Sequence, residues 1–181
     1  MTTSAVIPFP DTTEYAPYFA RYVERVPEGD ILDILTRQSG ETAALLGGVS
    51  EDEASFRYAP DKWSIRQVVG HVTDTERVML YRALSFARGE QAMLPGFDEN
   101  AWVQSARFDE RTLHGLADEF RLVRAATIPF FAALTSEELR RVGMANNRTY
   151  TVRALAWIIA GHELHHVSLL RERYLSAMRA H

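Results

Sequence analysis

The chain has 181 residues, of which 46% are hydrophobic and 24% are charged, and its formal net charge is −4. This length and composition suit one soluble domain with a real hydrophobic core, while the negative charge excludes the basic surface that a nucleic-acid backbone requires. The sequence has no cysteine, no apolar run long enough to span a bilayer and no secretory signal in its first residues. We therefore expect a cytoplasmic protein without nucleic-acid or membrane partners, in which any metal is bound by His, Asp or Glu.

The N-terminal part is expected to contribute one short and one longer helix. Residues 1–13 are polar and include two prolines, which predicts an extended lead-in to a single domain over residues 14–181. Residues 14–26 are predicted to form a short extra helix. From residue 30 to about residue 46, apolar side chains recur at helical spacing and two glycines follow, which predicts an amphipathic helix.

The second main helix has the clearest start signal in the chain. Ser64 is a good N-cap residue and Gln67, three positions later, completes a capping box, so a helix is predicted from there to about residue 88. Gly89 is expected to end it. Residues 90–108 contain a Pro-Gly pair and are expected to form a long loop, and connections of that length are usually functional or packed on themselves.

The C-terminal half is expected to hold the other two main helices. One is predicted to begin near Asp109 and to kink at Pro129. Its apolar stripe consists of Leu113, Leu116, Ala117, Phe120, Val123, Phe130 and Phe131. A short helical turn is expected over 136–139, a loop over 143–147 and the last helix over 151–178. Since no segment shows sustained two-residue alternation, no strand is predicted, and the four main helices indicate an all-α four-helix bundle.

The last predicted helix carries two histidines on its apolar face. His162 and His166 are four residues apart, so on a helix their Cβ atoms lie roughly 5–6 Å apart. Both rings fall at the middle of the face that should be buried, where an unpartnered polar ring costs about 1–3 kcal/mol. A shared metal ion is the simplest partner for two imidazoles at this spacing.

A catalytic metal site usually has three protein ligands, so a third histidine is needed. His181 is the terminal residue, His114 flanks the stripe of its helix and is expected to be solvated, and His165 lies at the fringe of the apolar face. His71, two turns into the second main helix, remains. Taken alone, it fits a hydrogen-bonded structural histidine. Beside the histidine pair of the last helix in a bundle, metal ligation is the better interpretation.

The same segment also fits the His-Glu-x-x-His pattern of zinc proteases, in which the glutamate is the general base. The rest of the sequence argues against a protease, because His181 is the only histidine after His166 and no strand is predicted to hold a peptide substrate. Two interpretations of Glu163 therefore remain open. In one its carboxylate reaches a water molecule bound to the metal, and in the other it is solvated or ion-paired.

With His71, His162 and His166 assigned, the sequence resembles the DinB/YfiT-like superfamily of metal-binding four-helix bundles. The matching segments are RYAPDKWSI (57–65), GHVTDTER (70–77), YRAL (81–84), ARG (87–89), LPGFD (94–98) and AGHELHH (160–166). They cover most of the chain from about Tyr15 to Leu175, and their order makes the resemblance specific.

The resemblance implies a three-histidine site that holds a divalent ion, zinc or nickel, with water in the open positions. It also implies a homodimer. It leaves the reaction open, because relatives of this kind look like metal-dependent hydrolases or like transferases that use a low-molecular-weight thiol. An enzyme of either type would act on a small-molecule substrate by activating water or the thiol at the metal.

Five further side chains are candidates for a role at such a site. Glu163 and Glu76 are the candidates for acid-base catalysis, followed by Asp74 and Asp98, although each carboxylate also fits a surface or ion-paired position. Arg82 is the candidate for binding an anionic substrate or cofactor group, and an ion pair with a nearby carboxylate fits it equally well.

The alternative to an enzyme is a non-catalytic metal-binding or interaction module of the same fold. A fourth protein ligand that closes a tetrahedral site would favour this alternative. The side of the last helix opposite the histidines carries Trp157, Ala160 and Leu164. This helix is therefore expected to be covered on two sides, the second cover being either the N-terminal helix or another subunit.

Overall fold

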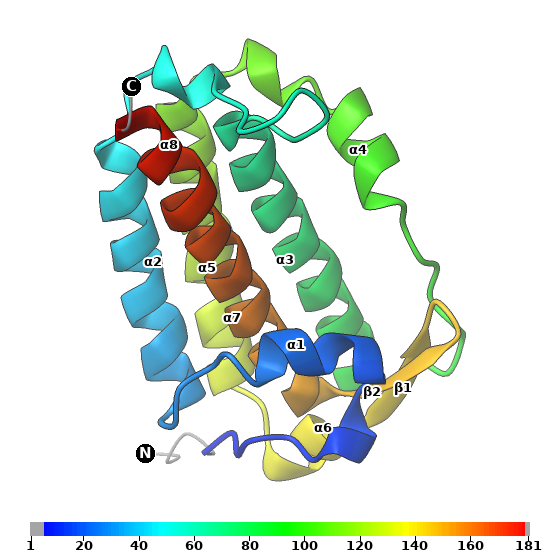
Figure 1. The fold of residues 1–181 in the computed structure, drawn as a ribbon. Helices are drawn as coiled ribbons and strands as arrows, with labels where there is room; N and C mark the ends of the chain where they lie inside the picture. Colours follow the sequence, from blue (N-terminus) through cyan, green and yellow to red (C-terminus); the bar gives the residue numbers. More distant parts are fainter. Residues whose placement is uncertain (1–5, 180–181) are drawn as a thin grey trace.

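Four long helices packed side by side form the body of the protein in a computed structural model, which describes residues 6–179 (Figure 1). They are α2 (Ile31–Gly47), α3 (Ile65–Ala87), α5 (Leu113–Ala132) and α7 (Val152–Leu169). A π-helix (Leu170–Leu175) and α8 (Ser176–Arg179) continue α7. The predicted all-α four-helix bundle is confirmed, and each main helix begins within a few residues of its predicted start.

The helices do not follow one another around the bundle. α2 packs against α5 and α7, and α3 packs against the same two helices. The consecutive helices α2 and α3 therefore lie diagonally across the bundle. The colours of Figure 1 show that α2 and α7 run in one direction while α3 and α5 run in the other. This arrangement places α3 directly against α7, the helix with the histidine pair.

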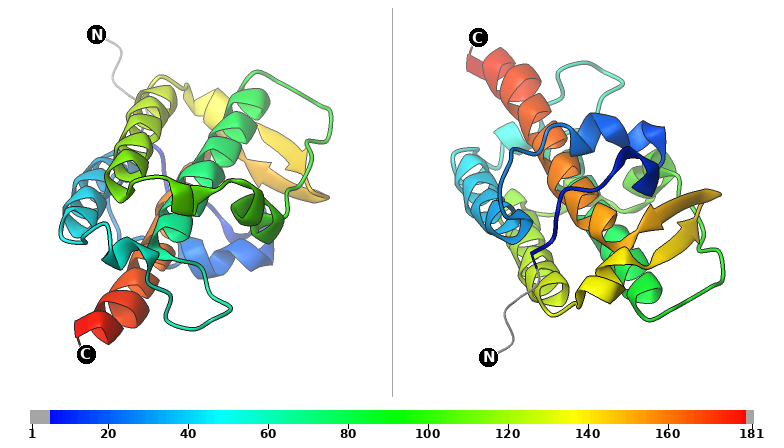
Figure 2. Two further views of the ribbon diagram at one scale, coloured as in Figure 1. Left: turned by 90° about the horizontal axis from the view of Figure 1, so that it is seen from above. Right: turned by 90° about the horizontal axis from the view of Figure 1, so that it is seen from below.

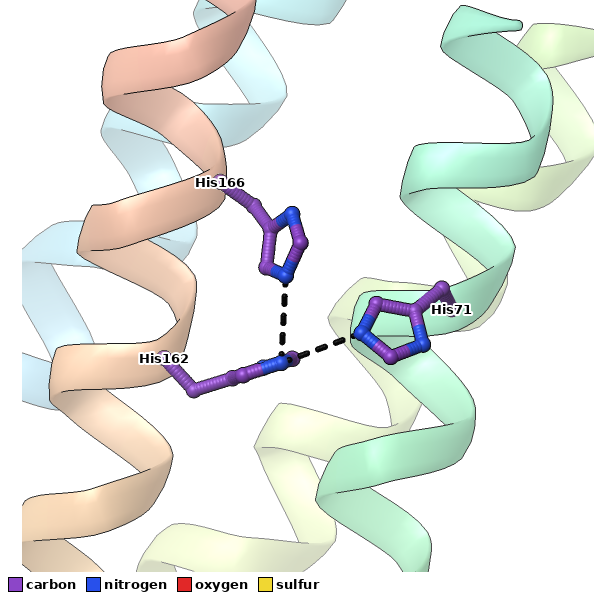
Figure 3. Close-up of side chains that lie close together, drawn as sticks. All are labelled: His71, His162 and His166. Carbon is purple, nitrogen blue, oxygen red and sulfur yellow. Dashed lines mark hydrogen bonds between the residues drawn. The ribbon is translucent and has the colours of Figure 1, made fainter. Parts of the chain in front are cut away.

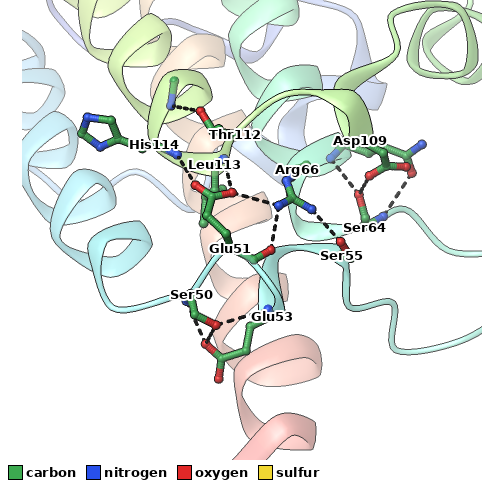
Figure 4. Close-up of polar contacts among 12 residues, drawn as sticks. Ser50, Glu51, Glu53, Ser55, Ser64, Arg66, Asp109, Thr112, Leu113 and His114 are labelled. Atoms are coloured by element: carbon green, nitrogen blue, oxygen red, sulfur yellow. Dashed lines mark hydrogen bonds and ion pairs between the residues drawn. The ribbon is translucent and has the colours of Figure 1, made fainter.

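The loop between α2 and α3 is tied to the start of α5 by polar contacts (Figure 4). Glu51 accepts hydrogen bonds from the backbone N–H groups of Leu113 at 2.9 Å and His114 at 3.2 Å, and it pairs with Arg66 of α3 at 2.8 Å. A carboxylate at a helix N-terminus satisfies N–H groups that have no partner within the helix. The capping box predicted at Ser64 is also present, so α3 begins where the sequence indicates.

A two-stranded antiparallel hairpin precedes α7 and corrects the prediction that the chain has no strand. β1 (Val142–Ala145) pairs with β2 (Arg148–Thr151), and the first residue of β1 lies opposite the last residue of β2. Asn146 and Asn147 form the turn with φ values of 51° and 56°, a conformation that asparagine tolerates better than most residues. Strands of 4 residues are too short for a two-residue alternation to stand out in the sequence.

The connection between α3 and α5 is not the plain loop expected over residues 90–108. It contains α4 (Glu99–Ser105) and a 3-10 turn (Phe108–Glu110), and Leu94 forms a bridge with Ala145 of β1. A helix of 7 residues makes only two turns, which is too few for helical periodicity to reveal. The connection therefore packs along the bundle and against the hairpin.

The N-terminal segment differs from the single helix expected over residues 14–26. It forms two 3-10 turns (Thr12–Glu14 and Pro17–Phe19), followed by the one-turn helix α1 (Ala20–Val23). Pro17 begins the second turn, where its missing N–H is tolerated. The remaining short elements are a 3-10 turn (Glu53–Ser55) and α6 (Ser136–Arg140). No helix in the described part of the chain is long and apolar enough to cross a membrane.

α1 packs closely against α7 (Figure 2). The closest approach is at Gly161, where an added Cβ would lie 2.1 Å from the carbonyl oxygen of Tyr22. Nearby, Trp157 is 2% exposed and its ring lies 4.8 Å from that of Phe9, measured between centroids. The N-terminal segment thus covers the face of α7 for which the sequence allowed either this segment or a second subunit.

Replacing Gly161 with alanine should destabilise the protein, because the new Cβ would overlap the backbone of Tyr22. Overpacking of this kind costs about 1–3 kcal/mol, and urea unfolding should show a loss of that size. Gly40 of α2 is the matched control, since a Cβ there meets nothing within 4 Å. Gly40→Ala should stabilise the helix by about 0.5–1 kcal/mol. Equal effects of the two substitutions would contradict the close packing of α1 on α7.

Glu14 joins the N-terminal segment to the start of α7 by accepting hydrogen bonds from Thr151 and Arg153, both at 2.6 Å. Burial alone would raise the pKa of Glu14, but these hydrogen bonds lower it to about 2. Because this pKa lies below the unfolded value near 4.5, the stabilisation exists at neutral pH and is lost as pH falls toward 2. Glu14→Gln should lower the free energy of unfolding by on the order of 1–2 kcal/mol at pH 7. A deficit of the same size at pH 2, or an equal effect of Glu28→Gln at an exposed site, would refute this linkage.

Candidate metal centre

Three imidazoles meet between α3 and α7 (Figure 3). His71 comes from α3, and His162 and His166 come from successive turns of α7. The Nε2 atom of His162 lies 3.1 Å from the Nε2 atoms of both other rings. The three residues are only 4%, 6% and 8% exposed. The sequence-based expectation that these rings converge in the interior is confirmed.

Hydrogen bonds among neutral imidazoles cannot satisfy all three nitrogens. A ring nitrogen of neutral histidine carries either one hydrogen or one lone pair. The Nε2 atom of His162 can therefore form a hydrogen bond with only one of its two neighbours, and the other contact lacks either a proton or a lone pair. A cation placed among three lone pairs would satisfy all of them at once.

Burial keeps the three rings neutral. Removal from water lowers the pKa of His71 to about 4 and holds the pKa values of His162 and His166 well below the usual 6.5, and repulsion from neighbouring histidines adds to the effect. At pH 7 the cluster therefore presents lone pairs rather than protons. This is the form in which histidine binds metals.

Aromatic rings cover the cluster on two sides. Trp63 lies against His71 with ring centroids 4.7 Å apart and stacks over His166 at 6.5 Å. Tyr22 packs edge-on against His162 at 5.3 Å. These contacts restrict the orientation of the imidazoles and separate them from bulk water.

The other described histidines, His114 and His165, lie outside the cluster. His165 is half-buried, and its ring packs against Tyr22 at 5.4 Å. His114 is exposed and lies 3.3 Å from Asp118, in agreement with the solvated position expected for it. His181 lies outside the described residues.

A buried arginine connects the two histidine-bearing helices with the rest of the bundle. Arg124 of α5 donates to both oxygens of Glu76 of α3 at 2.9 Å and to Glu163 of α7 at 2.7 Å. It also donates to the carbonyl of Leu35 of α2 at 3.0 Å. Thr42 of α2 donates to the second oxygen of Glu163 at 2.6 Å. One guanidinium thus contacts all three other main helices, and the charged side chains are at most 2% exposed.

Glu76 and Glu163, the two carboxylates considered for acid-base catalysis, therefore both bind Arg124. Neither belongs to the group of side chains that could share a metal ion, which in the described part of the chain consists of the three histidines. Burial raises the pKa of Glu163 against the opposing attraction of Arg124. These contacts support a positioning role, in which the network sets how α3 and α7 present His71 and His162.

Arg124, Trp63 and Tyr22 are site residues that the sequence analysis missed. Arg124 follows Phe120 by four positions and so lies on the buried stripe of α5, where an arginine signals an internal ion pair. No comparable signal exists for Trp63 or Tyr22. Their approach to the histidines depends on how the loop before α3 and the N-terminal segment fold back.

The remaining candidate site residues, Asp74, Asp98 and Arg82, do not contact the Arg124 network. Asp74 pairs with Arg77 at 3.1 Å on the same helix, and Asp98 is the N-cap of α4. Both carboxylates thus have local structural partners. Arg82 forms no ion pair with any described residue and lines a cavity beside His162.

Comparisons with known proteins agree on the fold. The family model of the DinB superfamily matches residues 34–170. YfiT from Bacillus subtilis, described as a probable metal-dependent hydrolase with an unusual four-helix bundle topology, superposes with a TM-score of 0.75. It is 17% identical, and the match covers 87% of this chain and 91% of YfiT. The DinB-like protein YjoA, also from Bacillus subtilis, superposes with a TM-score of 0.58 at 23% identity, over 82% of this chain and 92% of its own.

A curated relative from Oceanobacillus iheyensis, named "Putative metal-dependent hydrolase", is 30% identical over 72 residues. The match spans 40% of this chain and 40% of the relative. It therefore covers less than half of either protein.

Removing the guanidinium of Arg124 should destabilise the whole bundle, because two buried carboxylates would lose their counter-charge. Breaking a buried ion pair costs about 3–5 kcal/mol, and Arg124→Met should lower the free energy of unfolding by that amount in a urea titration. Arg121, on the exposed side of the same helix, pairs with Asp118 and has a side chain that is 60% exposed. Arg121→Met should cost less than about 1 kcal/mol. If both variants are equally stable, Arg124 does not hold the helices together.

Proposed function

Because the chain belongs to the DinB superfamily, we propose that its three-histidine cluster binds a divalent cation, zinc or nickel, and that the protein is a metal-dependent hydrolase of a small molecule. One observation carries the proposal: three buried, neutral Nε2 atoms converge and cannot satisfy one another. The name of the Oceanobacillus iheyensis relative and the description of YfiT support the same class of activity.

The donor set fits such an ion. Nitrogen ligands lie about 2.0–2.1 Å from zinc, so two ligands of a tetrahedral ion are roughly 3.3–3.4 Å apart. The Nε2 separations of 3.1 Å are close to this value, and small ring rotations would suffice for binding. Imidazole is a good ligand for zinc and for nickel. The three imidazole nitrogens can therefore bind either metal.

Three ligands leave a coordination position for the reactants. Within the described residues, no fourth histidine, aspartate or glutamate joins the group. Catalytic zinc sites have three protein ligands, whereas structural sites are closed by a fourth. When bound, the ion supplies Lewis acidity, which polarises an acyl oxygen and lowers the pKa of water.

The chain's own residues would hold the reactants in place. Trp63 and Tyr22 shield the imidazoles from bulk water, which strengthens electrostatic interactions within the site. The Arg124 network maintains the register of the helices that carry the ligands. We assign no acid-base role to Glu76 or Glu163, because the contacts of their carboxylates are with Arg124 and, for Glu163, also Thr42.

The family resemblance also implies thiol transfer and dimerisation, which we propose in addition to metal-dependent hydrolysis. The chain has no cysteine, so thiol transfer would require a low-molecular-weight thiol from outside. A homodimer would need a surface other than the face of α7 that the N-terminal segment covers. Activity assays with and without added thiol test the first feature, and light scattering tests the second.

Metal analysis tests the site directly. The purified protein should contain about one zinc or nickel ion per chain, and His71→Ala or His162→Ala should weaken metal binding by on the order of 100-fold or more, since each removes one of three ligands. His114→Ala is the matched control, because this exposed histidine lies outside the cluster and its loss should leave the metal content unchanged.

Unchanged metal content in both cluster variants would contradict the ligand assignment. For the activity, a chelator should abolish hydrolysis of a panel of esters and amides, and zinc or nickel should restore it. Metal-loaded protein that turns over no member of the panel, with or without thiol, would instead identify a non-catalytic metal-binding module.

A further inference from the structure

A cavity of about 160 Å³ lies beside His162. It is lined by residues of α3, α7, the N-terminal turns with α1, the hairpin and the connection that leads into α4. Figures 1 and 2 show these segments gathered at the end of the bundle where α3 ends and α7 begins. The walls combine polar side chains with aromatic ones, which include Tyr18, Tyr22, Phe97 and Tyr150. The cavity therefore leads from the imidazoles to the hairpin end of the bundle.

Arg82 contributes a buried positive charge to this cavity. The residue is 3% exposed, and its guanidinium donates to the carbonyl of Pro95 at 3.1 Å and to the sulfur of Met79 at 3.7 Å. A guanidinium has five N–H groups, so three have no acceptor among the described protein groups. No described carboxylate forms an ion pair with Arg82, in contrast to Arg124, which binds two. The guanidinium carbon also lies 5.9 Å from the centroid of the Tyr150 ring. A cation–π contact of this length leaves the buried charge without a counter-ion, which favours binding of an anion.

Two further polar groups line the same cavity without a full set of partners. Thr75 is 4% exposed, and its buried hydroxyl has no hydrogen-bond partner among residues 6–179. Arg148 of β2 lies over the ring of Tyr18 at 5.3 Å and, within residues 6–179, forms no ion pair. Glu99 is the one carboxylate among the lining residues, and it is exposed at the start of α4. The two arginines and the hydroxyl of Thr75 outnumber the one carboxylate, so the cavity favours an anion over a cation.

We propose that this cavity binds a small carboxylic acid with an aryl or acyl stem, whose carboxylate is held by Arg82 and whose stem extends along the aromatic walls toward His162. A planar guanidinium matches the two oxygens of a carboxylate. The aromatic side chains in the walls suit a ring or short apolar chain. The inference deepens the proposed function, because it names the class of molecule that reaches the imidazoles.

The dimensions favour a short molecule. Thr75 and Arg82 are seven residues apart on α3, which corresponds to about 10 Å along the helix axis. Helical side chains tilt toward the N-terminus, in agreement with the contact of Arg82 to Met79 one turn earlier. A ring and a short linker span this length. In a hydrolase, water would add to an acyl carbon near His162, the ester or amide bond would break, and the leaving group would take up the proton.

Calorimetric titration with 3-phenylpropionate tests the carboxylate subsite. The neutral amide of the same acid and phenyl phosphate are the comparison ligands, and each is titrated into chelator-treated and zinc-loaded protein. We expect 3-phenylpropionate to bind more tightly than the amide in both forms. Arg82→Gln should weaken its binding at least about 10-fold, Arg82→Lys less, and the amide should be unaffected. Arg37→Gln, whose side chain is 57% exposed on α2, is the matched control.

Stability separates this role from a structural one. Because Arg82 has no carboxylate partner in the described protein, Arg82→Gln should melt at the same temperature as the wild type or higher, whereas a structural arginine would lower it. A second variant, Thr75→Val, should weaken carboxylate binding by a smaller factor. It keeps the shape of the side chain and removes the unpartnered hydroxyl.

Equal affinity of the wild type and Arg82→Gln for 3-phenylpropionate would overturn the proposal. Binding that requires zinc and ignores Arg82 would place the carboxylate on the metal and would also overturn it. Tighter binding of phenyl phosphate would replace the carboxylate by a phosphate. Carboxylate binding that depends on Arg82 in a protein without metal affinity would leave this subsite standing and refute the metal-dependent hydrolase alone.

Discussion

The guanidinium of Arg124 is the interaction on which the arrangement of the bundle depends. It lies on α5 and contacts α2 through a carbonyl, α3 through Glu76 and α7 through Glu163. Apolar side chains alone allow helices to slide or rotate with small changes in energy, because dispersion and burial have little direction. A buried ion pair has a defined geometry, and displacing it leaves unpaired charges in the interior. One residue thus sets the register of four helices.

This register has a direct effect on the three-histidine cluster. Glu163 is the neighbour of His162 on α7, and Glu76 follows His71 by five positions on α3. Because both carboxylates bind the same guanidinium, the segments of α3 and α7 that carry the histidines are kept at the same height along the bundle. The network contains two carboxylates and one guanidinium, so its formal charge is negative when both acids are ionised. A divalent cation beside it would be electrostatically favourable.

Much of the fold could be predicted from the sequence because the main helices are long. The capping box at Ser64 and the 3.6-residue periodicity that follows it predict the start of α3 to within one residue. The four-residue spacing of His162 and His166 predicts that both rings lie on one face of α7. The hairpin and α4 are not predicted from the sequence, because elements of 4 and 7 residues are too short to show a clear periodicity. Arg124 is not predicted in this way, because the helical periodicity of α5 is defined by its apolar side chains. The pairing of His71 with α7 needed tertiary contact, and the sequence supported it only through the resemblance and the expected bundle.

The cavity beside His162 is lined largely by elements outside the four-helix frame. Its aromatic wall comes from the N-terminal turns, from the hairpin and from the connection after α3, whereas the imidazoles and Arg124 belong to the main helices. Loops and short elements accept insertions and substitutions far more readily than a packed core does. Divergence among relatives can therefore reshape this cavity while the frame that carries the three histidines stays constant. A scaffold divided in this way lets natural selection change the walls of the cavity and the histidine cluster independently.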